Sequence, residues 1–331
     1  MEENVFCECK RWNYGPHYNI IKDKSMQKCP LCSITRNLDG TIILRNKNIS
    51  SSSNDFLYHL GLGTSSNNLK EMFGDVKFVC MGGTPHRMEA FARHLIKILD
   101  RNDELIDLTG CAKRYSMFKV GPVIAVNHGM GYSSCTILLH EVIKLMFHAK
   151  CKDPIFIRLG TSGGIGVEPG TVVVSSGGVD ARLRDCYEIP IAGKLSQKLC
   201  RTDFDLIENL KSVVTPSDHF KVITGKTMAA TDFYEEQGRL DGAFCGITET
   251  EKLDYLKKLY EGGVRNIEME SVPFFAYTHY AGIKAADVCV TLIDRLKGDQ
   301  VITPKSKLSE FENYPQEIVG RFIKKQLEQF D

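Results

Sequence analysis

Short apolar runs alternate along the chain with longer segments in which apolar residues recur every three or four positions. Short apolar runs bounded by glycine, proline or polar residues are typical of strands buried in a sheet. On this criterion the sequence predicts strands at 76–81, 123–127, 155–159, 171–175, 221–224, 264–269 and 286–293. The intervening segments are long enough for helices, so the pattern favours an α/β fold.

Three of the intervening segments have the spacing of an amphipathic helix. One begins at Pro85, a residue that suits a first helical position, and places Met88, Phe91 and Leu95 on one face. A second covers residues 137–150, with Ser133 or Ser134 as a candidate N-cap. The third covers 318–330 near the end of the chain.

The first 54 residues differ from the rest of the sequence. They are polar and end in a serine-rich stretch, Ser50–Asn54, which is typical of a linker. We therefore expect a flexible N-terminal extension at 1–54 and a single α/β domain at 55–331. The extension contains Cys7, Cys9, Cys29 and Cys32, and a disordered extension is favoured over a zinc site because the CxC pair is irregular for zinc.

Composition and charge narrow the functional classes. The chain has 331 residues, of which 43% are hydrophobic and 25% charged, and its net charge is +1. Without a basic excess, nucleic acids and anionic membrane surfaces are not expected partners. No apolar run is long enough to span a bilayer, and the polar start is unlike a signal peptide. The twelve cysteines, several inside apolar runs, favour reduced thiols in a cytoplasmic protein.

The segment Arg158–Gly166 is the strongest candidate for an anion site. Its glycines allow the backbone to approach a ligand closely, and Thr161 adds a hydroxyl donor. Arginine offers a fork that fits two phosphate oxygens; the alternative is a tight turn with glycines for geometry alone. Because a predicted strand at 171–175 follows, instead of a helix, the segment is neither a P-loop nor a dinucleotide-binding loop.

Two further arginines fit the same interpretation. Gly83 and Arg87 follow a predicted strand at the start of a helix, where anions are favoured, and Arg114 precedes another apolar run. Taken singly, each arginine is more often a surface ion-pair partner. Together with the glycine-rich segments they indicate one anion site.

Polar clusters after two other strands indicate a sugar and a ring. Glu268 and Glu270 flank Met269, and a carboxylate pair can accept hydrogen bonds from a diol such as ribose. The alternative, a helix N-terminus with glutamate for its dipole, explains Glu270 but not the pair. In residues 232–242, Gln237 and Arg239 offer the donors and acceptor that read a planar ring, and Phe233 can stack on it. The alternative there is an exposed polar loop.

An anion, a diol and a planar ring together indicate a nucleoside and phosphate. At these residues the chain resembles the animal-type uridine phosphorylases, a branch of the nucleoside phosphorylase-I family. The matching segments are GDVKFVCMGGTPHRM (74–88), RYSMFKVGPV (114–123), NHGMG (127–131), IRLGTSGGIGVEPGTVV (157–173), DFYEEQGRLDGA (232–243), VRNIEMES (264–271) and VCVTLIDRLKGDQ (288–300). The resemblance covers residues 55–330.

The resemblance implies a central mixed sheet closing toward a barrel, flanked by helices. It implies phosphate binding by Gly83, Arg87, Arg114, Arg158 and Thr161. It assigns the ribose to His59, Glu268, Met269 and Glu270, and the uracil ring to Phe233, Gln237 and Arg239. The catalytic residues would be Arg158, Gln237, Arg239 and Glu270. His59 matches a histidine that reaches the neighbouring subunit's site, which implies a homodimer with shared sites, or a ring of dimers.

The implied activity is reversible phosphorolysis of uridine, and of deoxyuridine, in pyrimidine salvage. Uracil and ribose 1-phosphate are the products, inorganic phosphate is a co-substrate, and no metal or organic cofactor is expected. Glu236, Tyr132 and Pro273 depart from the family pattern without removing a predicted contact. Two alternatives stay open: a catalytically silent nucleoside-binding homologue, and a purine or methylthioadenosine phosphorylase, for which Gln237 with Arg239 is less suited.

Overall fold

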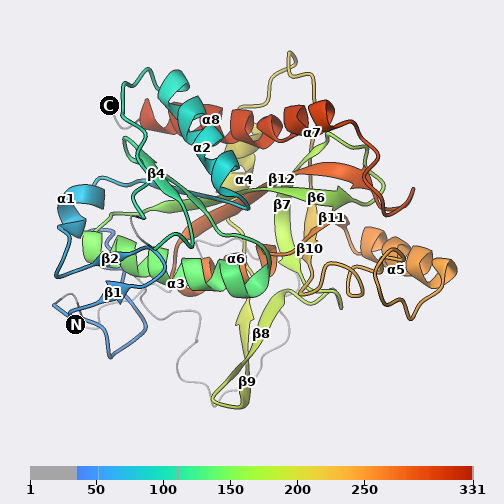
Figure 1. Ribbon diagram of the computed structural model, residues 1–331, viewed down its shortest axis with the longest axis horizontal. Helices are drawn as coiled ribbons and strands as arrows, with labels where there is room; N and C mark the ends of the chain where they lie inside the picture. The colour runs from blue at the N-terminus through green and yellow to red at the C-terminus, as the bar shows by residue number, and fades with distance from the viewer. Residues whose placement is uncertain (1–35, 51, 110–111, 330–331) are drawn as a thin grey trace, which may run out of the picture.

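The computed structural model describes residues 36–50, 52–109 and 112–329 (Figure 1). Its strands are β1 Phe56–Leu57, β2 Leu62–Gly63, β3 Phe78–Gly82, β4 Met117–Val120, β5 Val123–Asn127, β6 Ile155–Gly164, β7 Val172–Val179, β8 Cys186–Ile191, β9 Lys194–Leu199, β10 Val222–Ala229, β11 Val264–Glu268 and β12 Lys284–Asp294. Its helices are α1 Leu69–Phe73, α2 Pro85–Ile98, α3 Gly131–Ala149, α4 Phe204–Lys211, α5 Glu249–Glu261, α6 Ser271–Tyr280, α7 Lys305–Phe311 and α8 Asn313–Leu327.

The main sheet is mixed and partly closed. Its strand order is β11-β10-β7-β12-β6-β3-β5-β4, and β11 also pairs antiparallel with β6, joining Ile267 to Gly163. The strands from β11 to β6 therefore close into a barrel, while β3, β5 and β4 extend from it as an open sheet. β12 runs parallel to β6 and antiparallel to β7. The predicted mixed sheet that closes toward a barrel is confirmed.

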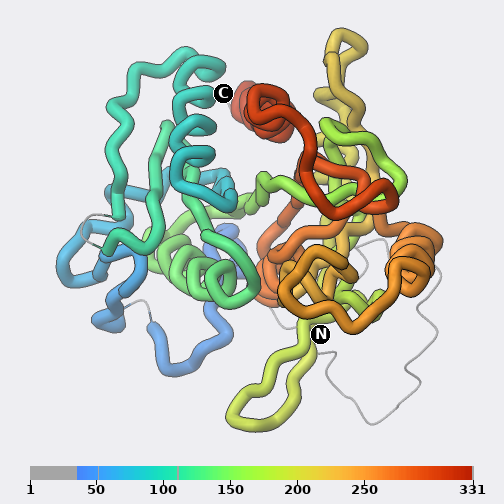
Figure 2. The backbone as a smooth tube through the Cα atoms, turned by 45° about the vertical axis from the view of Figure 1, so that its right-hand side comes forward, coloured from blue at the N-terminus to red at the C-terminus, as the bar shows by residue number. Residues whose placement is uncertain are grey.

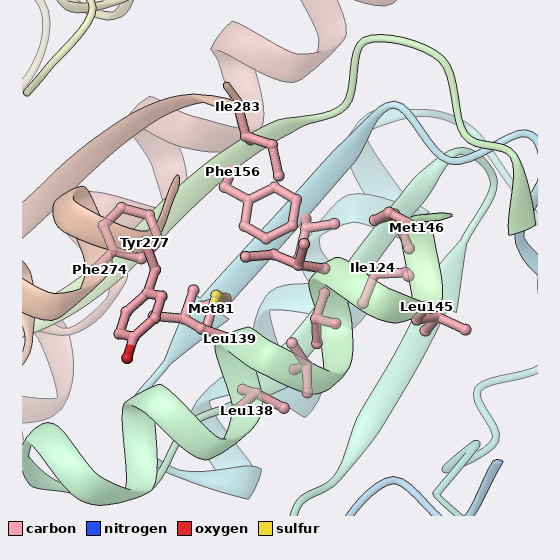
Figure 3. Packing of buried hydrophobic residues seen from close by; sticks show 14 of the residues in the cluster. Met81, Ile124, Leu138, Leu139, Leu145, Met146, Phe156, Phe274, Tyr277 and Ile283 are labelled. Carbon is pink, nitrogen blue, oxygen red and sulfur yellow. The ribbon is translucent and has the colours of Figure 1, made fainter. Parts of the chain in front are cut away.

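Helices cover both faces of this sheet (Figure 1). On one face α2, α4 and α8 bury one apolar cluster, which includes Phe91, Leu210 and Phe322. On the other face α3 and α6 bury a second cluster, where Leu138 of α3 and Phe274 of α6 pack near Met81 and Phe156 of the sheet (Figure 3). This helix–sheet–helix layering places the carboxyl ends of β3, β6 and β11 near one another, where α/β folds bind ligands.

Two local predictions were wrong. The glycines from Gly160 to Gly164 belong to strand β6 and are not a loop, because β12 and β11 pair with this stretch through Gly164. An added Cβ at Gly160 would lie 2.8 Å from the Sγ of Cys289, so this position requires glycine for close strand packing. Helix α3 begins at Gly131, six residues before the predicted start, and neither candidate serine caps it.

A hairpin that the sequence did not predict projects from the body. Strands β8 and β9 pair antiparallel through the two-residue turn Ala192–Gly193 (Figure 2). Both turn residues have positive φ, 48° and 79°, as in the type I′ turn that suits a two-residue hairpin. Short half-exposed strands with this turn carry a weaker apolar signal than the buried strands of the barrel.

The division predicted at residue 54 stays a prediction. Of the residues before it that the structure describes, Ile42 is buried in the main core and Thr41 forms a bridge with Lys152. Arg36 Nε donates a hydrogen bond to the carbonyl of Gly282 at 2.8 Å. The four cysteines considered for zinc lie outside the described residues. No helix among the described residues is long and apolar enough to cross a membrane.

Candidate functional site

A buried arginine lies among carboxylates at the centre of the barrel. Arg158 of β6 is 2% exposed, and its guanidinium forms ion pairs with Glu268 at 2.9 Å, Asp287 at 2.8 Å, and Glu270. Asp287 stands on β12 directly opposite Arg158 in the parallel register. Burial alone would lower the pKa of Arg158, but these carboxylates and the Cys289 thiol raise it well above its ordinary value. Arg158 is therefore a permanent, rigidly held cation.

The two glutamates are held at the junction of β11 and α6. The carboxylate of Glu268 accepts hydrogen bonds from the backbone N–H of Glu270 at 2.7 Å and from the Ser271 hydroxyl at 2.6 Å. Glu270 accepts a hydrogen bond from the Gly131 N–H at 2.6 Å, at the first turn of α3. A carboxylate from a distant segment thus caps α3, which explains why no serine is needed there.

The same glutamates titrate differently. Burial raises the pKa of Glu268 to about 7; the attraction of Arg158 opposes this rise, and the repulsion of Glu270 and Asp287 adds to it. Burial also opposes ionisation of Glu270, but Arg158, His128 and the Gly131 N–H hold its pKa below its ordinary value. At neutral pH Glu270 is a carboxylate, while Glu268 exchanges its proton near pH 7. Paired groups with separated pKa values are suited to holding a diol.

The predicted anion residues Gly83, Arg87 and Thr161 lie together. Strand β3 ends at Gly82, and α2 begins at Pro85, so Arg87 lies in the first turn of a helix. Its Nε donates a hydrogen bond to the Thr84 hydroxyl at 3.0 Å, and its Nη1 lies 3.4 Å from Thr161 Oγ1. A Cβ on Gly83 would lie 2.9 Å from Arg87 Nη2. A side chain at this position would displace the end of the Arg87 side chain.

Burial lowers the pKa of Arg87, with the carboxylate of Glu312 opposing the shift and the positive charge of Arg158 adding to it. A cavity of about 10 Å³ separates Arg87 and Thr161 from Glu312 and Gln316 at the start of α8. Arg87 and Arg158 therefore offer two desolvated cations in neighbouring positions. An anion between helix α2 and strand β6 would relieve their mutual repulsion.

Two predicted residues, His59 and Arg114, lie elsewhere. His59 is half exposed, and its Nδ1 is 2.6 Å from the carboxylate of Glu141 on α3. Arg114 is exposed, 6.0 Å from the ring of Tyr115, and His59 lies 6.3 Å from the same ring. Among the described residues, no contact joins either side chain to Arg158. Arg114 is thus exposed and His59 half exposed, and both lie beside the ring of Tyr115.

The predicted base-reading residues form a second group, in which Phe233 is 40% exposed. Gln237 and Arg239 are buried, and the guanidinium of Arg239 lies 4.5 Å from the ring centre of Phe233. Asp241 binds Arg239 through two hydrogen bonds of 2.8 and 2.7 Å. Glu236 departs from the family pattern in the sequence. Its carboxylate accepts hydrogen bonds from the N–H and hydroxyl of Thr231 and so joins the two ends of residues 231–236. The segment is therefore ordered and buries Gln237 and Arg239, while residues 231–235 are exposed, as the loop alternative expects.

Three buried polar residues near these groups were missed by sequence reasoning. Arg295, 1% exposed, donates hydrogen bonds to the side chain and the carbonyl of Gln237. Arg295 directly follows an apolar strand. A charge at the end of an apolar run is the signal that identified Arg158, so the sequence could have identified Arg295 in the same way. Asp287 and His128 gave no such signal. His128 is fully buried, and burial lowers its pKa to about 4. Among the described residues, no cluster of side chains could hold a metal ion.

The comparisons with known proteins agree with this geometry. Residues 77–324 match the family model described as the phosphorylase superfamily. The chain belongs to this superfamily. The chain is 48% identical to human uridine phosphorylase 2 over 276 residues, which cover 82% of this chain and 87% of the relative. The expected resemblance is confirmed.

Two proteins of Schistosoma mansoni sharpen the comparison. The inactive uridine phosphorylase B is 38% identical to the chain over 281 residues, covering 85% of this chain and 95% of that relative. The crystal structure of the uridine phosphorylase in complex with thymidine has a TM-score of 0.83 at 39% identity, covering 86% of this chain and 99% of that one. Similarity in sequence within this family therefore does not by itself separate active members from inactive ones.

Proposed function

We propose that the protein cleaves uridine with inorganic phosphate to give uracil and ribose 1-phosphate, reversibly. The observation that carries this proposal is the contact of Arg158 with Glu268 and Glu270 inside the barrel, beside Arg87 and Thr161. This arrangement offers a cationic anion site next to carboxylates that suit a sugar diol. Similarity to uridine phosphorylases supports the choice of nucleoside.

The proposed binding mode follows from the chemistry of each group. Phosphate lies against Gly83 and Arg87, which follow β3, and against Arg158 and Thr161, which lie on β6. The ribose hydroxyls donate to Glu270, and Met269, half-buried between β11 and α6, packs on the apolar face of the sugar. The uracil ring lies against Phe233 and is read by Gln237 and Arg239.

In the reaction a phosphate oxygen bonds to C1′ of the sugar while the N1–C1′ bond breaks. The electron pair of the broken bond leaves on uracil, where it is shared with the ring carbonyl oxygens. Arg239 and Gln237 stabilise this charge with donors held in place before the reaction. Phosphate stabilises the positive charge that develops on the sugar. Every step uses side chains and phosphate, so we propose that no metal or organic cofactor takes part.

We further propose a homodimer in which His59, and Arg114 beside it, complete the partner's site. The support is that both residues lie on an outward patch without contact to Arg158. Neither a His59→Ala subunit nor an Arg239→Ala subunit would have a complete site in its own homodimer. Mixed dimers of the two would contain one intact site, so co-refolding should restore activity; no recovery after confirmed subunit exchange would refute the shared site.

The silent alternative is favoured by one observation, the inactive relative at 38% identity. A phosphate-dependent uracil-release assay separates the two functions. Release of uracil from uridine supports the enzyme, whereas binding of uridine without release supports the silent homologue. Running deoxyuridine, thymidine and inosine in parallel determines the preferred nucleoside, and faster cleavage of inosine would replace the proposal with a purine phosphorylase. A cytoplasmic location is supported by the free cysteines among the described residues, and a role in pyrimidine salvage follows from the proposed reaction.

A further inference from the structure

Two opposite charges are buried behind residues 232–242, which we call the base-reading segment. They lie away from the proposed sugar and phosphate sites. Lys252, in the first half of α5, is 5% exposed, and Asp299, in the loop after β12, is 9% exposed. The Lys252 ammonium lies 2.9 Å from Asp299 Oδ2. Burying such a pair costs desolvation energy, and breaking it by removing one partner leaves an uncompensated charge. The proposed reaction does not require either group to touch the substrate.

Asp299 also makes two contacts with the base-reading segment and one with Arg295. Its Oδ2 accepts a hydrogen bond from the Leu240 N–H at 3.0 Å, and its backbone carbonyl accepts one from Arg239 Nη2 at 2.7 Å. Its Oδ1 accepts a hydrogen bond from Arg295 at 3.0 Å. Asp299 therefore holds Arg239 through its backbone carbonyl, and it reaches Gln237 through Arg295.

Arg295 determines which way the Gln237 amide points. The arginine has only donors, and its Nη1 and Nη2 face the side-chain oxygen and backbone carbonyl of Gln237 at 3.4 and 3.0 Å. The amide oxygen is thus turned toward Arg295, which leaves the amide N–H donors for the ring. A base-reading glutamine in the wrong amide orientation would offer an acceptor where a carbonyl oxygen of the ring needs a donor.

Helix α5 touches the same segment at a second point. Gly238 has a φ of +63°, and a Cβ there would lie 3.3 Å from the ring of Tyr255, which is one turn along α5 from Lys252. The Tyr255 hydroxyl is itself anchored by a hydrogen bond to the carbonyl of Ala181 at 3.1 Å. Lys252 and Tyr255 hold the segment from neighbouring turns of one helix.

We propose that Lys252 and Asp299 are positioning residues for base recognition: the ion pair holds Gln237 and Arg239 in the geometry that reads the ring. The inference rests on the proposed function, because it concerns the same base site. It explains why a charge pair is buried in a wall that apolar residues could form. It also assigns α5, a helix at the edge of the molecule (Figure 1), a role in substrate choice.

Lys252→Met and Asp299→Asn test the inference, with Lys257→Met as the matched control because Lys257 is an exposed lysine on the same helix. Either test variant should raise the KM for uridine about tenfold to a hundredfold, since small displacements of positioning groups have effects of this size. The KM for phosphate should stay within about threefold of the wild type because the anion site does not contact this network. Thermal unfolding establishes that each variant is folded, and Asp299→Asn keeps the side-chain shape if Lys252→Met does not fold.

Because the two residues act through one contact, the double variant should be no worse than Asp299→Asn alone. An unchanged uridine KM in a folded variant would overturn the inference, and so would an equal rise in both KM values, which indicates general loosening. A wild-type protein that binds uracil without cleaving uridine refutes the proposed reaction alone. The variants' uracil dissociation constants, measured by calorimetry, then decide the inference. A wild type that binds neither uracil nor uridine overturns both.

Discussion

Arg158→Met tests whether the stability of the fold depends on the positive charge of the buried arginine. Methionine keeps much of the length and packing of the side chain but removes the cation from among Glu268, Glu270 and Asp287. Removing one partner of a buried ion pair typically costs about 3–5 kcal/mol of unfolding free energy. We expect a loss in this range at pH 8, because repulsion among the three carboxylates is then unopposed.

The unfolding free energy lost in Arg158→Met should depend on pH, and the pKa of Glu268 determines the direction of this dependence. Its pKa in the folded protein is raised from the ordinary 4.5 to about 7, so the folded state holds more protons than the unfolded chain between these values. A group of this kind adds stability below pH 4.5 and loses it as the pH rises through 7. Without Arg158 the pKa values of Glu268 and Glu270 rise further. The penalty of Arg158→Met should therefore shrink as the pH falls from 8 to 5.5.

Denaturant unfolding of wild type and Arg158→Met at pH 8 and pH 5.5 measures both effects. Phosphate at a hundred times its dissociation constant should stabilise the wild type by about 2.7 kcal/mol and leave the variant unchanged. Arg182→Met is the control, since its ion pair with Glu188 is exposed and should matter by less than about 1 kcal/mol. An Arg158→Met protein within about 1 kcal/mol of wild type at pH 8, or a penalty independent of pH, would refute this reasoning.

Three further predictions concern activity. Arg239→Ala should lower kcat/KM for uridine by about a hundredfold to a thousandfold, as for other lost transition-state donors, with phosphate affinity intact; collapse of phosphate binding in equilibrium titrations would show that the residue is misassigned. Phe233→Leu should weaken uracil binding by about twofold to fivefold in calorimetry, because it removes the ring 4.5 Å from the Arg239 guanidinium; unchanged affinity contradicts stacking. Glu268→Gln should abolish the change in rate near pH 7 that ionisation of Glu268 causes in the wild type. A pH–rate profile with the same limb in both proteins assigns that limb to another group.

The barrel shows where local patterns carry enough information and where they do not. An apolar run such as Ile155–Leu159 is recognisable because burial on both faces requires it, and β6 does begin there. The second half of β6, Gly160–Gly164, has the local sequence of a loop because glycine has a poor intrinsic preference for strands. Pairing with β12 and β11 makes it a strand, and neither partner is near it in the sequence.

Helix α3 illustrates the same limit at a helix end. Ser133 and Ser134 are good local capping residues, but the helix begins before them at Gly131. The N–H of Gly131, the first residue of the helix, donates to the carboxylate of Glu270, which is 139 positions away in sequence. A cap supplied by a distant segment leaves no local signature, so only the folded chain reveals it.

The sequence by itself determined the chemistry of this protein. Alternating apolar runs required a layered α/β fold, and a charged residue in an apolar run, such as Arg158, had to find partners because an unpaired buried charge is too costly. Tertiary structure decided which partners they found. It placed Glu268, Glu270 and Asp287 around Arg158, turned His59 outward, and set Lys252 and Asp299 behind the base-reading segment. The physical reason is that burial and charge pairing depend on contacts between residues far apart in the chain, whereas periodicity records only each residue's own environment.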